Sequence, residues 1–222
     1  MIPSLTERFD VSEAELRALL DDTLAGADDG ELFLEYREQE SLAFDNGRLK
    51  AGNFSVDQGF GLRAVAGEAV GFAHADDFSI AALKRAADAV AAVKTGHKGV
   101  YAEPPVGTNA KLYGEDNPIG APSFEEKVAL LQRIDAYLRG QGDDVRQVSA
   151  TIGAQWQGVE ILRADGRLVK DVRPLVRFNV SVVCGEGDRQ ETGSFGAGGR
   201  TAFGEFMVAD TWQGIADKAL AQ

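Results

Sequence analysis

The amino-acid sequence predicts an α+β fold, a mostly antiparallel β-sheet with helices packed on one face. Three observations support it. Residues 12–15 and 123–126 both place a serine three positions before a glutamate, which is a signal for the start of a helix. Several segments alternate apolar and polar residues, as half-buried strands do. Asn-Gly at 46–47 and Asp-Gly at 165–166 separate such segments, and these dipeptides are typical of hairpin turns.

The first half of the chain reads as helix, strands, helix. Leucines at helical spacing follow Ser12 until Gly26, where the glycine provides a stop signal. Extended segments joined by tight turns come next, at residues 31–44, 48–51, 55–65 and 69–75. Ser79 then caps a second helix.

Residues 95–122 contain four of the six prolines and are expected to form a long connector, the most protease-sensitive part of the chain. Beyond it, a helix starts at Ser123. Extended segments follow, at residues 147–156, 159–164, 167–172 and 176–184. A glycine-rich loop is expected at 193–200, and the chain ends in a helical pattern.

The two halves share this order of elements, which defines predicted sub-halves at 12–94 and 123–222. Residues 42–49 and 161–168 also resemble each other around their turn dipeptides. An ancient duplication would explain both facts. Hairpins are common, however, so coincidence explains them about as well.

Composition narrows the class of protein. Thirty-five acidic against 23 basic residues give a formal charge of -12, which repels nucleic acid and anionic membranes. Cys184 is the single cysteine, so no internal disulfide is expected. Without a signal-peptide pattern or a long apolar run, the sequence predicts a cytoplasmic protein with no membrane contact.

Gly59, Gly61 and Ala64 fit the G-x-G-x-x-A pattern of a dinucleotide-binding loop. Such a loop must lead into a helix, whereas the residues after Gly61 continue as a strand toward the turn at 66–68. The pattern is better explained by close approach of another backbone to the glycines. The second cluster, at 193–200, lacks the first glycine and the lysine of a phosphate-binding loop.

No catalytic constellation is evident in the sequence. His74, His97 and Cys184 are the only strong nitrogen or sulfur ligand candidates, and they lack metal-ligand spacing. His74 is expected to be a hydrogen-bonded structural residue, and Cys184 an inert thiol on the apolar side of a strand.

Four separated stretches, in this order, are similar to the N-terminal half of the TldD/PmbA family: SVDQGFGLRAVAGEAVGFAHAD (55–76), LYGEDNPIG (112–120), RADGRLVKDVRPLVRFNVSV (163–182) and RQETGSFGAGGR (189–200). The resemblance covers nearly the whole chain, from about residue 32 onward. It implies a zinc metallopeptidase that cleaves unfolded peptides, pairs with a PmbA- or TldE-like paralogue, and is also described as a modulator of DNA gyrase.

The family resemblance places zinc in the C-terminal half, in a His-Glu-x-x-x-His helix with a later cysteine. This chain contains neither, so no catalytic or metal residue is carried over to it, and it is expected to be inactive alone. We therefore expect a non-catalytic N-terminal domain, separated from its zinc domain, that contributes to the substrate channel and the subunit interface. The alternative is a free-standing module that binds extended peptides at a sheet edge.

The candidate channel residues lie in the two glycine clusters. Glycines allow the main chain of an unfolded substrate to come close, and arginines can bind its carboxylates. The candidates are Gly59, Gly61, Arg63, Gly193, Gly196, Gly198, Gly199 and Arg200. For Arg63, an internal ion pair is the favoured alternative, and the role of Arg200 stays open.

Overall fold

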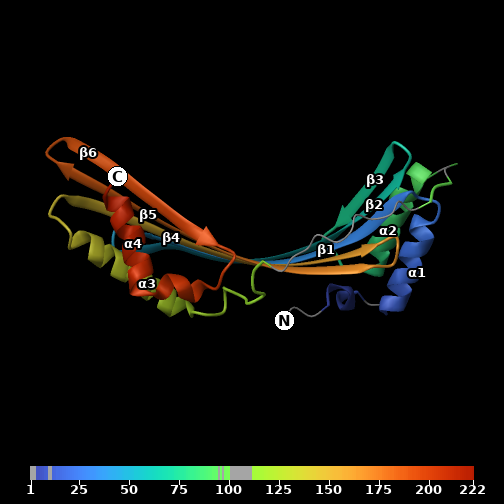
Figure 1. The fold of residues 1–222 in the computed structure, drawn as a ribbon, viewed down its shortest axis with the longest axis horizontal. Coiled ribbons are helices and arrows are strands. Elements are labelled where there is room, and N and C mark those ends of the chain that lie inside the picture. The colour runs from blue at the N-terminus through green and yellow to red at the C-terminus, as the bar shows by residue number, and fades with distance from the viewer. Residues whose placement is uncertain (1–3, 10–11, 95, 97, 101–111) are drawn as a thin grey trace. The chain divides into compact units, whose positions relative to one another are not determined.

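The computed structural model describes residues 4–9, 12–94, 96, 98–100 and 112–222. Six strands form one sheet in the order β3-β2-β1-β4-β5-β6 (Figure 1). Antiparallel pairing joins β2 to β3 and β5 to β6. The strands are β1 (Asp29–Asp45), β2 (Arg48–Ala66), β3 (Ala69–Ala75), β4 (Val145–Arg163), β5 (Leu168–Glu186) and β6 (Arg189–Gly199). The predicted α+β class is confirmed.

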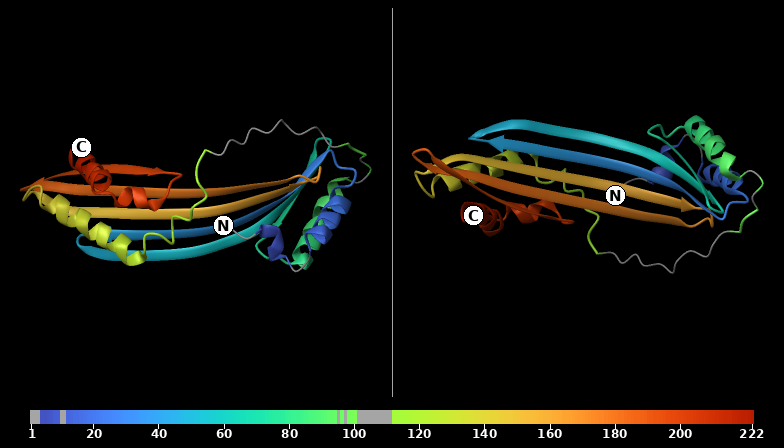
Figure 2. Two further views of the ribbon diagram at one scale, coloured as in Figure 1. Left: turned by 60° about the horizontal axis from the view of Figure 1, so that its bottom comes forward. Right: turned by 90° about the horizontal axis from the view of Figure 1, so that it is seen from above.

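Two details of the predicted strands were wrong. Pairs of short segments are in fact single strands of 19 residues in β2, β4 and β5. The predicted glycine-rich loop at 193–200 is mostly strand, because β6 continues to Gly199 in register with β5. Figure 2 gives two further views of these strands, and the sheet order places β3 and β6 at the two edges.

Both predicted hairpin turns are present. Asn46 and Gly47 have φ angles of 52° and 77°, and Gly166 has a φ of 80°. These values lie in the left-handed region, which glycine and asparagine tolerate best. The dipeptides therefore reverse the chain between β1 and β2 and between β4 and β5.

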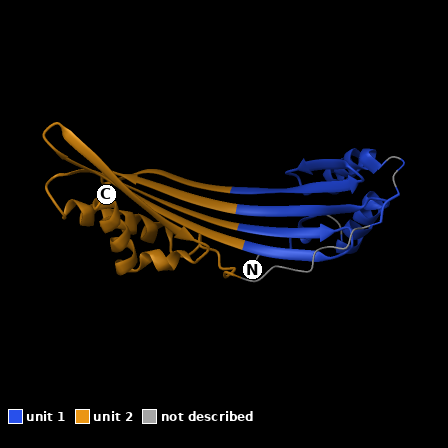
Figure 3. Cartoon of the chain, turned by 45° about the horizontal axis from the view of Figure 1, so that its top comes forward, with its two compact units in different colours: residues 1–37, 56–111, 157–172 blue, residues 38–55, 112–156, 173–222 orange. Residues whose placement is uncertain are grey.

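The chain divides into two compact units that are not consecutive halves (Figure 3). Unit 1 comprises residues 1–37, 56–111 and 157–172, and unit 2 comprises 38–55, 112–156 and 173–222. The long strands cause this difference from the predicted sub-halves, since β1, β2, β4 and β5 each contribute residues to both units. Each unit has its own hydrophobic core.

In unit 1, two helices pack against the sheet. Ser12 caps α1 (Glu13–Leu24) through the predicted capping box, and Ser79 caps α2 (Ile80–Ala91), which continues as η2 (Ala92–Lys94). The apolar face of α1 is fully buried against even-numbered residues of the strands. The core of unit 1 includes Leu16, Leu20, Leu24, Leu32, Leu34, Phe60, Leu62, Leu83, Val90 and Leu162.

A buried carboxylate anchors the N-terminal segment of unit 1. Glu160 is 5% exposed, accepts the backbone N–H of Thr6 at 3.3 Å, and pairs with the ammonium of Lys170 at 2.9 Å. Phe9, which follows η1 (Leu5–Arg8), packs edge-on against Phe78 with ring centroids 5.1 Å apart. Leu5 and Phe9 thereby belong to the core of unit 1.

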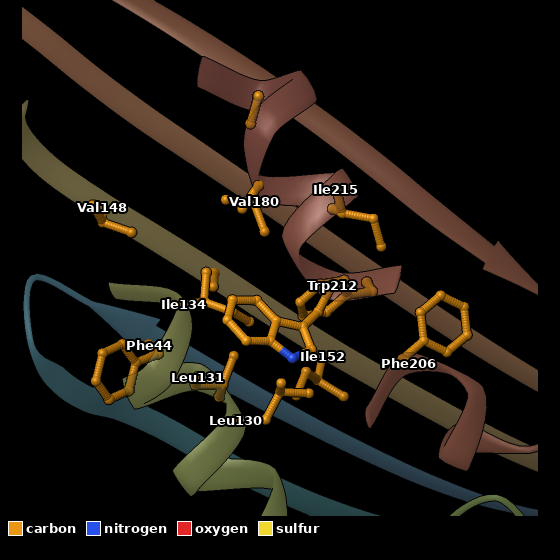
Figure 4. Packing of buried hydrophobic residues seen from close by; sticks show 14 of the residues in the cluster. Phe44, Leu130, Leu131, Ile134, Val148, Ile152, Val180, Phe206, Trp212 and Ile215 are labelled. Atoms are coloured by element: carbon orange, nitrogen blue, oxygen red, sulfur yellow. The ribbon is translucent and has the colours of Figure 1, made fainter. Parts of the chain in front are cut away.

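In unit 2, α3 (Phe124–Arg139), η3 (Phe203–Met207) and α4 (Ala209–Leu220) cover one face of the strands. Ser123 caps α3 through the second predicted capping box. Trp212 lies at the centre of the core shown in Figure 4, and its indole N–H has no hydrogen-bond partner among the described residues. The labelled core residues are Phe44, Leu130, Leu131, Ile134, Val148, Ile152, Val180, Phe206, Trp212 and Ile215.

Residues 112–122, which we call the strap, were predicted to be the end of a connector but are tied to unit 2. The indole N–H of Trp156 donates to the Glu115 carbonyl at 3.0 Å. The fully buried Lys127 donates to the Ile119 carbonyl at 2.6 Å and pairs with Glu40. These bonds involve the strap's own main chain, so the strap is folded structure. The connector residues 95, 97 and 101–111 lie outside the described residues.

Candidate functional site

The predicted channel residues are divided between the two units. Gly59, Gly61 and Arg63 belong to unit 1, whereas the residues from Gly193 to Arg200 belong to unit 2. Each group is therefore considered in its own unit.

In unit 1, Gly59 and Gly61 lie on the sheet face opposite the helices, but neighbouring atoms of β3 already occupy the space beside them. A Cβ atom at position 59 would lie 2.8 Å from the Ala75 carbonyl oxygen. One at position 61 would lie 3.1 Å from the ring of Phe72. Gly59 thus permits the close backbone approach that was predicted, whereas Gly61 makes room for a side chain of β3.

Arg63 forms the internal ion pairs expected as the alternative to peptide binding. Its guanidinium contacts Asp29 at 2.7 Å and Glu31 at 3.1 Å. Arg163 contacts the same two carboxylates, at 2.8 and 3.4 Å. Burial disfavours the charge of Arg63, but the hydrogen bonds that its guanidinium donates to Glu31 and Asp29 outweigh this effect and raise the pKa of Arg63. Its donors are therefore used within unit 1.

A pocket of about 490 Å³ lies on this same face of unit 1. His74 lines this pocket, and its ring stacks on that of Phe72 with ring centroids 5.7 Å apart. His74 was expected to be a hydrogen-bonded structural residue, whereas the structure shows an exposed, stacked ring. The strand continues after Gly61 as predicted, so no helix directly follows the glycines along the chain. Lining residues include Phe33, Arg37, Asp57, Gly59, Gly61, Arg63, Phe72 and His74.

In unit 2, the glycines of β6 face alternate sides of the sheet. Gly193 and Gly199 pair with Val182 and Val176, which are core residues, so both lie on the side of the helices. A Cβ at position 193 would overlap the Ala219 carbonyl of α4, so this glycine permits helix packing.

Gly196 and Gly198 lie on the helix-free side, opposite Asn179 and Arg177 of β5. A Cβ at position 198 would come within 2.4 Å of the Val176 carbonyl oxygen, and one at 196 within 2.4 Å of the Asn179 amide oxygen. These glycines allow β6 to pack closely against β5, and at these two positions they place no side chain on the helix-free face of β6.

Arg200 is held at the end of β6. Its guanidinium donates to the Pro174 carbonyl at 3.4 Å and lies over the Tyr113 ring, 5.1 Å from the centroid. Arg200 thus connects β5 to the strap.

The helix-free face of unit 2 carries a polar depression of about 350 Å³, which we call the polar groove. A Cβ at Gly153 would have the Cβ of Arg177, at 4.0 Å, as its nearest neighbour, so the floor is open there. The groove is lined by Gln39, Glu40, Ser41, Asn53, Ser55, Gly153, Ala154, Gln155, Leu175 and Arg177. A second depression, of about 360 Å³, shares Leu175 and Arg177 with it and extends to Gly196 and Gly198.

Most residues of the polar groove were not predicted as site residues from the sequence. The alternation at 147–156 showed which residues lie opposite the core, and Gly153 and Gln155 are among them. Polar residues on the exposed side of a strand usually face only water, so the pattern alone did not identify a site. What assembles the groove is the sheet order, which places β1 between β2 and β4.

The described residues do not fit a catalytic zinc site. No group of three or more histidine, cysteine, aspartate or glutamate side chains in this part of the chain could hold a metal ion. His74 lies in unit 1 and Cys184 in unit 2. Burial, together with nearby Asp144 and Glu191, raises the pKa of the Cys184 thiol, which disfavours the reactive thiolate.

No helix among the described residues has the length and apolar character required to span a bilayer. The predicted cytoplasmic location and the absence of nucleic-acid binding stay predictions.

Most of the chain matches two models of one protein family. Residues 30–93 match the family model described as PmbA/TldA metallopeptidase domain 1, and residues 117–222 match the PmbA/TldA metallopeptidase central domain. A metalloprotease TldD homolog from Haemophilus influenzae is 36% identical over 176 residues, which are 78% of this chain and 36% of that protein. One from Buchnera aphidicola subsp. Schizaphis graminum is 32% identical over 209 residues, 93% of this chain and 43% of that protein. The chain therefore spans less than half the length of these relatives.

Solved structures share the fold at low sequence identity. A protein from Bacteroides thetaiotaomicron described as a modulator of DNA gyrase superposes with a TM-score of 0.71 at 14% identity. This match covers 94% of this chain and 48% of that one. TldE from Thermococcus kodakarensis gives a TM-score of 0.66 at 15% identity, covering 94% and 46%.

Proposed function

The chain belongs to the TldD/PmbA family of metallopeptidases, and we propose that it is the non-catalytic N-terminal part of a zinc enzyme that degrades or processes unfolded peptides. In this proposal the chain binds the substrate, and zinc is held by the remainder of the full-length protein. The absence of a fitting ligand set among the described residues supports this division of labour.

The observation that carries the proposal is the polar groove of unit 2. Its lining offers hydroxyl and amide groups from Ser41, Asn53 and Gln155, which can both donate and accept hydrogen bonds. An unfolded peptide presents main-chain N–H and C=O groups at every residue, whatever its side chains. A surface with neutral donors and acceptors over a glycine floor therefore suits peptides of varied sequence.

Arg177 adds charge selectivity to the polar groove. It lies in the lining of both depressions, and no ion pair to its guanidinium is formed among the described residues. A guanidinium binds carboxylates through two parallel hydrogen bonds. We infer that acidic side chains or the C-terminal carboxylate of a peptide are preferred there.

The partner in this proposal is a paralogous, TldE-like subunit. The shared fold with TldE from Thermococcus kodakarensis is consistent with two related subunits that each carry such an N-terminal part. The subunit interface and the heterodimer are part of the proposal.

The test fills the floor of the polar groove in the full-length protein together with its partner. Gly153→Val adds a side chain where the nearest atom is 4.0 Å away, so folding should persist while the groove becomes shallower. We expect kcat/KM on an unfolded peptide to fall about tenfold, the equivalent of ~1.4 kcal/mol of lost binding. Zinc content and subunit assembly should be unchanged.

Gly204→Val is the matched control, because a Cβ there would meet no atom within 4 Å and the residue lies in η3, outside the groove. Equal kinetics for Gly153→Val and the parent enzyme would remove the groove from the substrate path. Peptide binding without hydrolysis in the full-length protein would favour the alternative, a peptide-binding module.

A further inference from the structure

Unit 1 carries a pocket of its own on the sheet face opposite its helices, which we call the aromatic pocket. Its lining comes from β1, β2, β3 and Asp76 directly after β3, all within unit 1. Its volume of about 490 Å³ lies within the range of ligand sites in proteins, about 300–1,000 Å³. The aromatic pocket is therefore large enough for a side chain of a bound peptide.

Aromatic rings flank a strip of the aromatic pocket that has no side chains. Gly59 and Gly61 lie on β2, and the sheet order places β2 between β1, which carries Phe33, and β3, which carries Phe72. Phe72 is 64% exposed, and its ring lies beside Gly61, where an added Cβ would be 3.1 Å from it. Single exposed apolar residues are common, but this one lines a concave site. Its ring offers a flat surface on which a ligand can stack.

One charged cluster at the aromatic pocket is already balanced. Arg63 and Arg163 both contact Asp29 and Glu31, so two guanidiniums meet two carboxylates. This cluster has no net charge, and its arginines are engaged within unit 1 rather than available to an anionic ligand.

The other charges of the lining are not balanced. Arg37 contacts Asp57 at 3.1 Å and Glu35 at 3.9 Å. Asp76 is exposed and forms no ion pair in the part of the chain that the structure describes. Three carboxylates against one guanidinium leave two excess negative charges, with His74 counted as neutral. The aromatic pocket is therefore complementary to a cation that also has an apolar surface.

We propose that the aromatic pocket binds an arginine side chain of the peptide substrate, an inference that rests on the proposed function. A guanidinium stacks favourably on an aromatic face and donates paired hydrogen bonds to carboxylates. Lysine fits less well, because its ammonium is more strongly hydrated and is not planar. An anionic group is repelled by the excess negative charge, and a purely apolar group leaves that charge uncompensated.

The positions of the Phe72 ring and of Asp76 suit this occupant. The ring lies beside Gly61, and the Asp76 Cα would be 3.4 Å from a Cβ at Gly59. Residues two positions apart on one face of a strand are separated by about 6–7 Å. A guanidinium that stacks on the Phe72 ring is thus within reach of the Asp76 carboxylate.

Two peptides that compete in one reaction test this proposal, with the full-length protein and its partner. The peptides are unfolded and identical except at one residue, which is arginine in one and citrulline, its neutral analogue of similar shape, in the other. We expect kcat/KM to be about tenfold higher for the arginine peptide, and the preference to shrink in high salt. The ratio of the two rates does not depend on the amount of active enzyme, so a variant that folds poorly still reports on the pocket.

Phe72→Ser and Asp76→Asn should each reduce the preference for arginine from about tenfold to below threefold. Val70→Ser and Glu68→Gln are the matched controls and should leave it unchanged. Val70 is 59% exposed on the same face of β3 as Phe72, and Glu68 is exposed in the turn before β3. Neither control residue lines the aromatic pocket.

Equal rates for the two peptides with the parent enzyme would overturn this inference alone, because the proposed function requires only that both be cleaved. Cleavage of neither peptide would overturn both. A preference for arginine that persists in Phe72→Ser and Asp76→Asn would place its origin outside the aromatic pocket and overturn the inference. Loss of the paralogous subunit from these two variants, with the preference unchanged, would assign the pocket to subunit assembly instead.

Discussion

Replacement of Lys127 by methionine should strongly destabilise unit 2. The Lys127 side chain is fully buried, and its ammonium pairs with Glu40 and donates to the Ile119 carbonyl of the strap. It also lies 5.5 Å from the centre of the Phe203 ring. Methionine has nearly the same length, so the substitution removes the charge with little change in packing.

The expected size follows from what the change leaves behind. The Glu40 side chain is only 14% exposed and would lose its partner in the ion pair. Loss of one partner of a buried ion pair typically lowers the free energy of unfolding by about 3–5 kcal/mol. This figure includes much of the effect of losing the Lys127 hydrogen bond to the Ile119 carbonyl of the strap. The double variant Lys127→Met with Glu40→Leu removes both charges and should recover to within about 2 kcal/mol of the parent.

Urea unfolding followed by far-ultraviolet circular dichroism measures both variants. Limited proteolysis reports on the strap separately, because residues 112–122 should be cut earlier in Lys127→Met than in the parent. A loss of stability below about 1 kcal/mol in the single variant, or a double variant as unstable as the single one, would refute the reasoning.

Further predictions concern particular side chains. Trp212→Phe should change the free energy of unfolding by less than about 1 kcal/mol, since it deletes an indole N–H that lacks a described partner. Trp156→Phe should cost about 2 kcal/mol, because it loses the hydrogen bond to the strap. Urea unfolding of the two variants compares these losses. Side-chain hydrogen bonds from two β4 residues lower the pKa of Asp45. The contribution of Asp45 to folding stability is therefore present above its unfolded pKa of about 3.9 and is lost as the pH falls through the lower folded pKa. The difference in stability between the parent and Asp45→Asn should shrink over that acid range. Gly198→Val should cost at least about 1–3 kcal/mol in urea unfolding, because its Cβ would press on the β5 backbone. Cys184 should react with a thiol reagent at pH 8 more slowly in the native chain than in urea, as its raised pKa implies.

Local signals in the sequence were reliable because their causes are local. Ser12 and Ser123 cap the helices that follow them through hydrogen bonds only three residues away. Likewise, the dipeptide at 46–47 forms its turn because those residues tolerate positive φ angles. Predictions that depend on a few neighbouring residues could therefore be made without knowledge of the fold.

Predictions that depended on distant partners were less accurate. In β2, residues 52–54 are exposed on both faces, and they were left between two predicted strands although the strand runs through them. Pro174 lies within β5, yet it is tolerated because β6 pairs only from Val176 onward. The glycines of β6 suggested a loop, whereas contact with Ala219 and with the β5 backbone explains them.

The candidate site shows the same limit. Ion pairing of Arg63 could be anticipated from its place in a strand within an acidic chain. The polar groove could not, because its lining comes from β1, β2, β4 and β5, and only the sheet order brings these strands together.

The composition of unit 1 has a consequence for synthesis on the ribosome. Leu162 and Ala164 belong to its core, and Glu160 anchors its N-terminal segment, yet all three are made long after α2. A nascent chain that has emerged only as far as residue 94 therefore lacks one strand of its own core. Because contacts of such long sequence separation form slowly, α1 and β1–β3 should wait with exposed leucines until β4 arrives. Chaperone binding to ribosome-bound chains should accordingly persist until β4 has emerged.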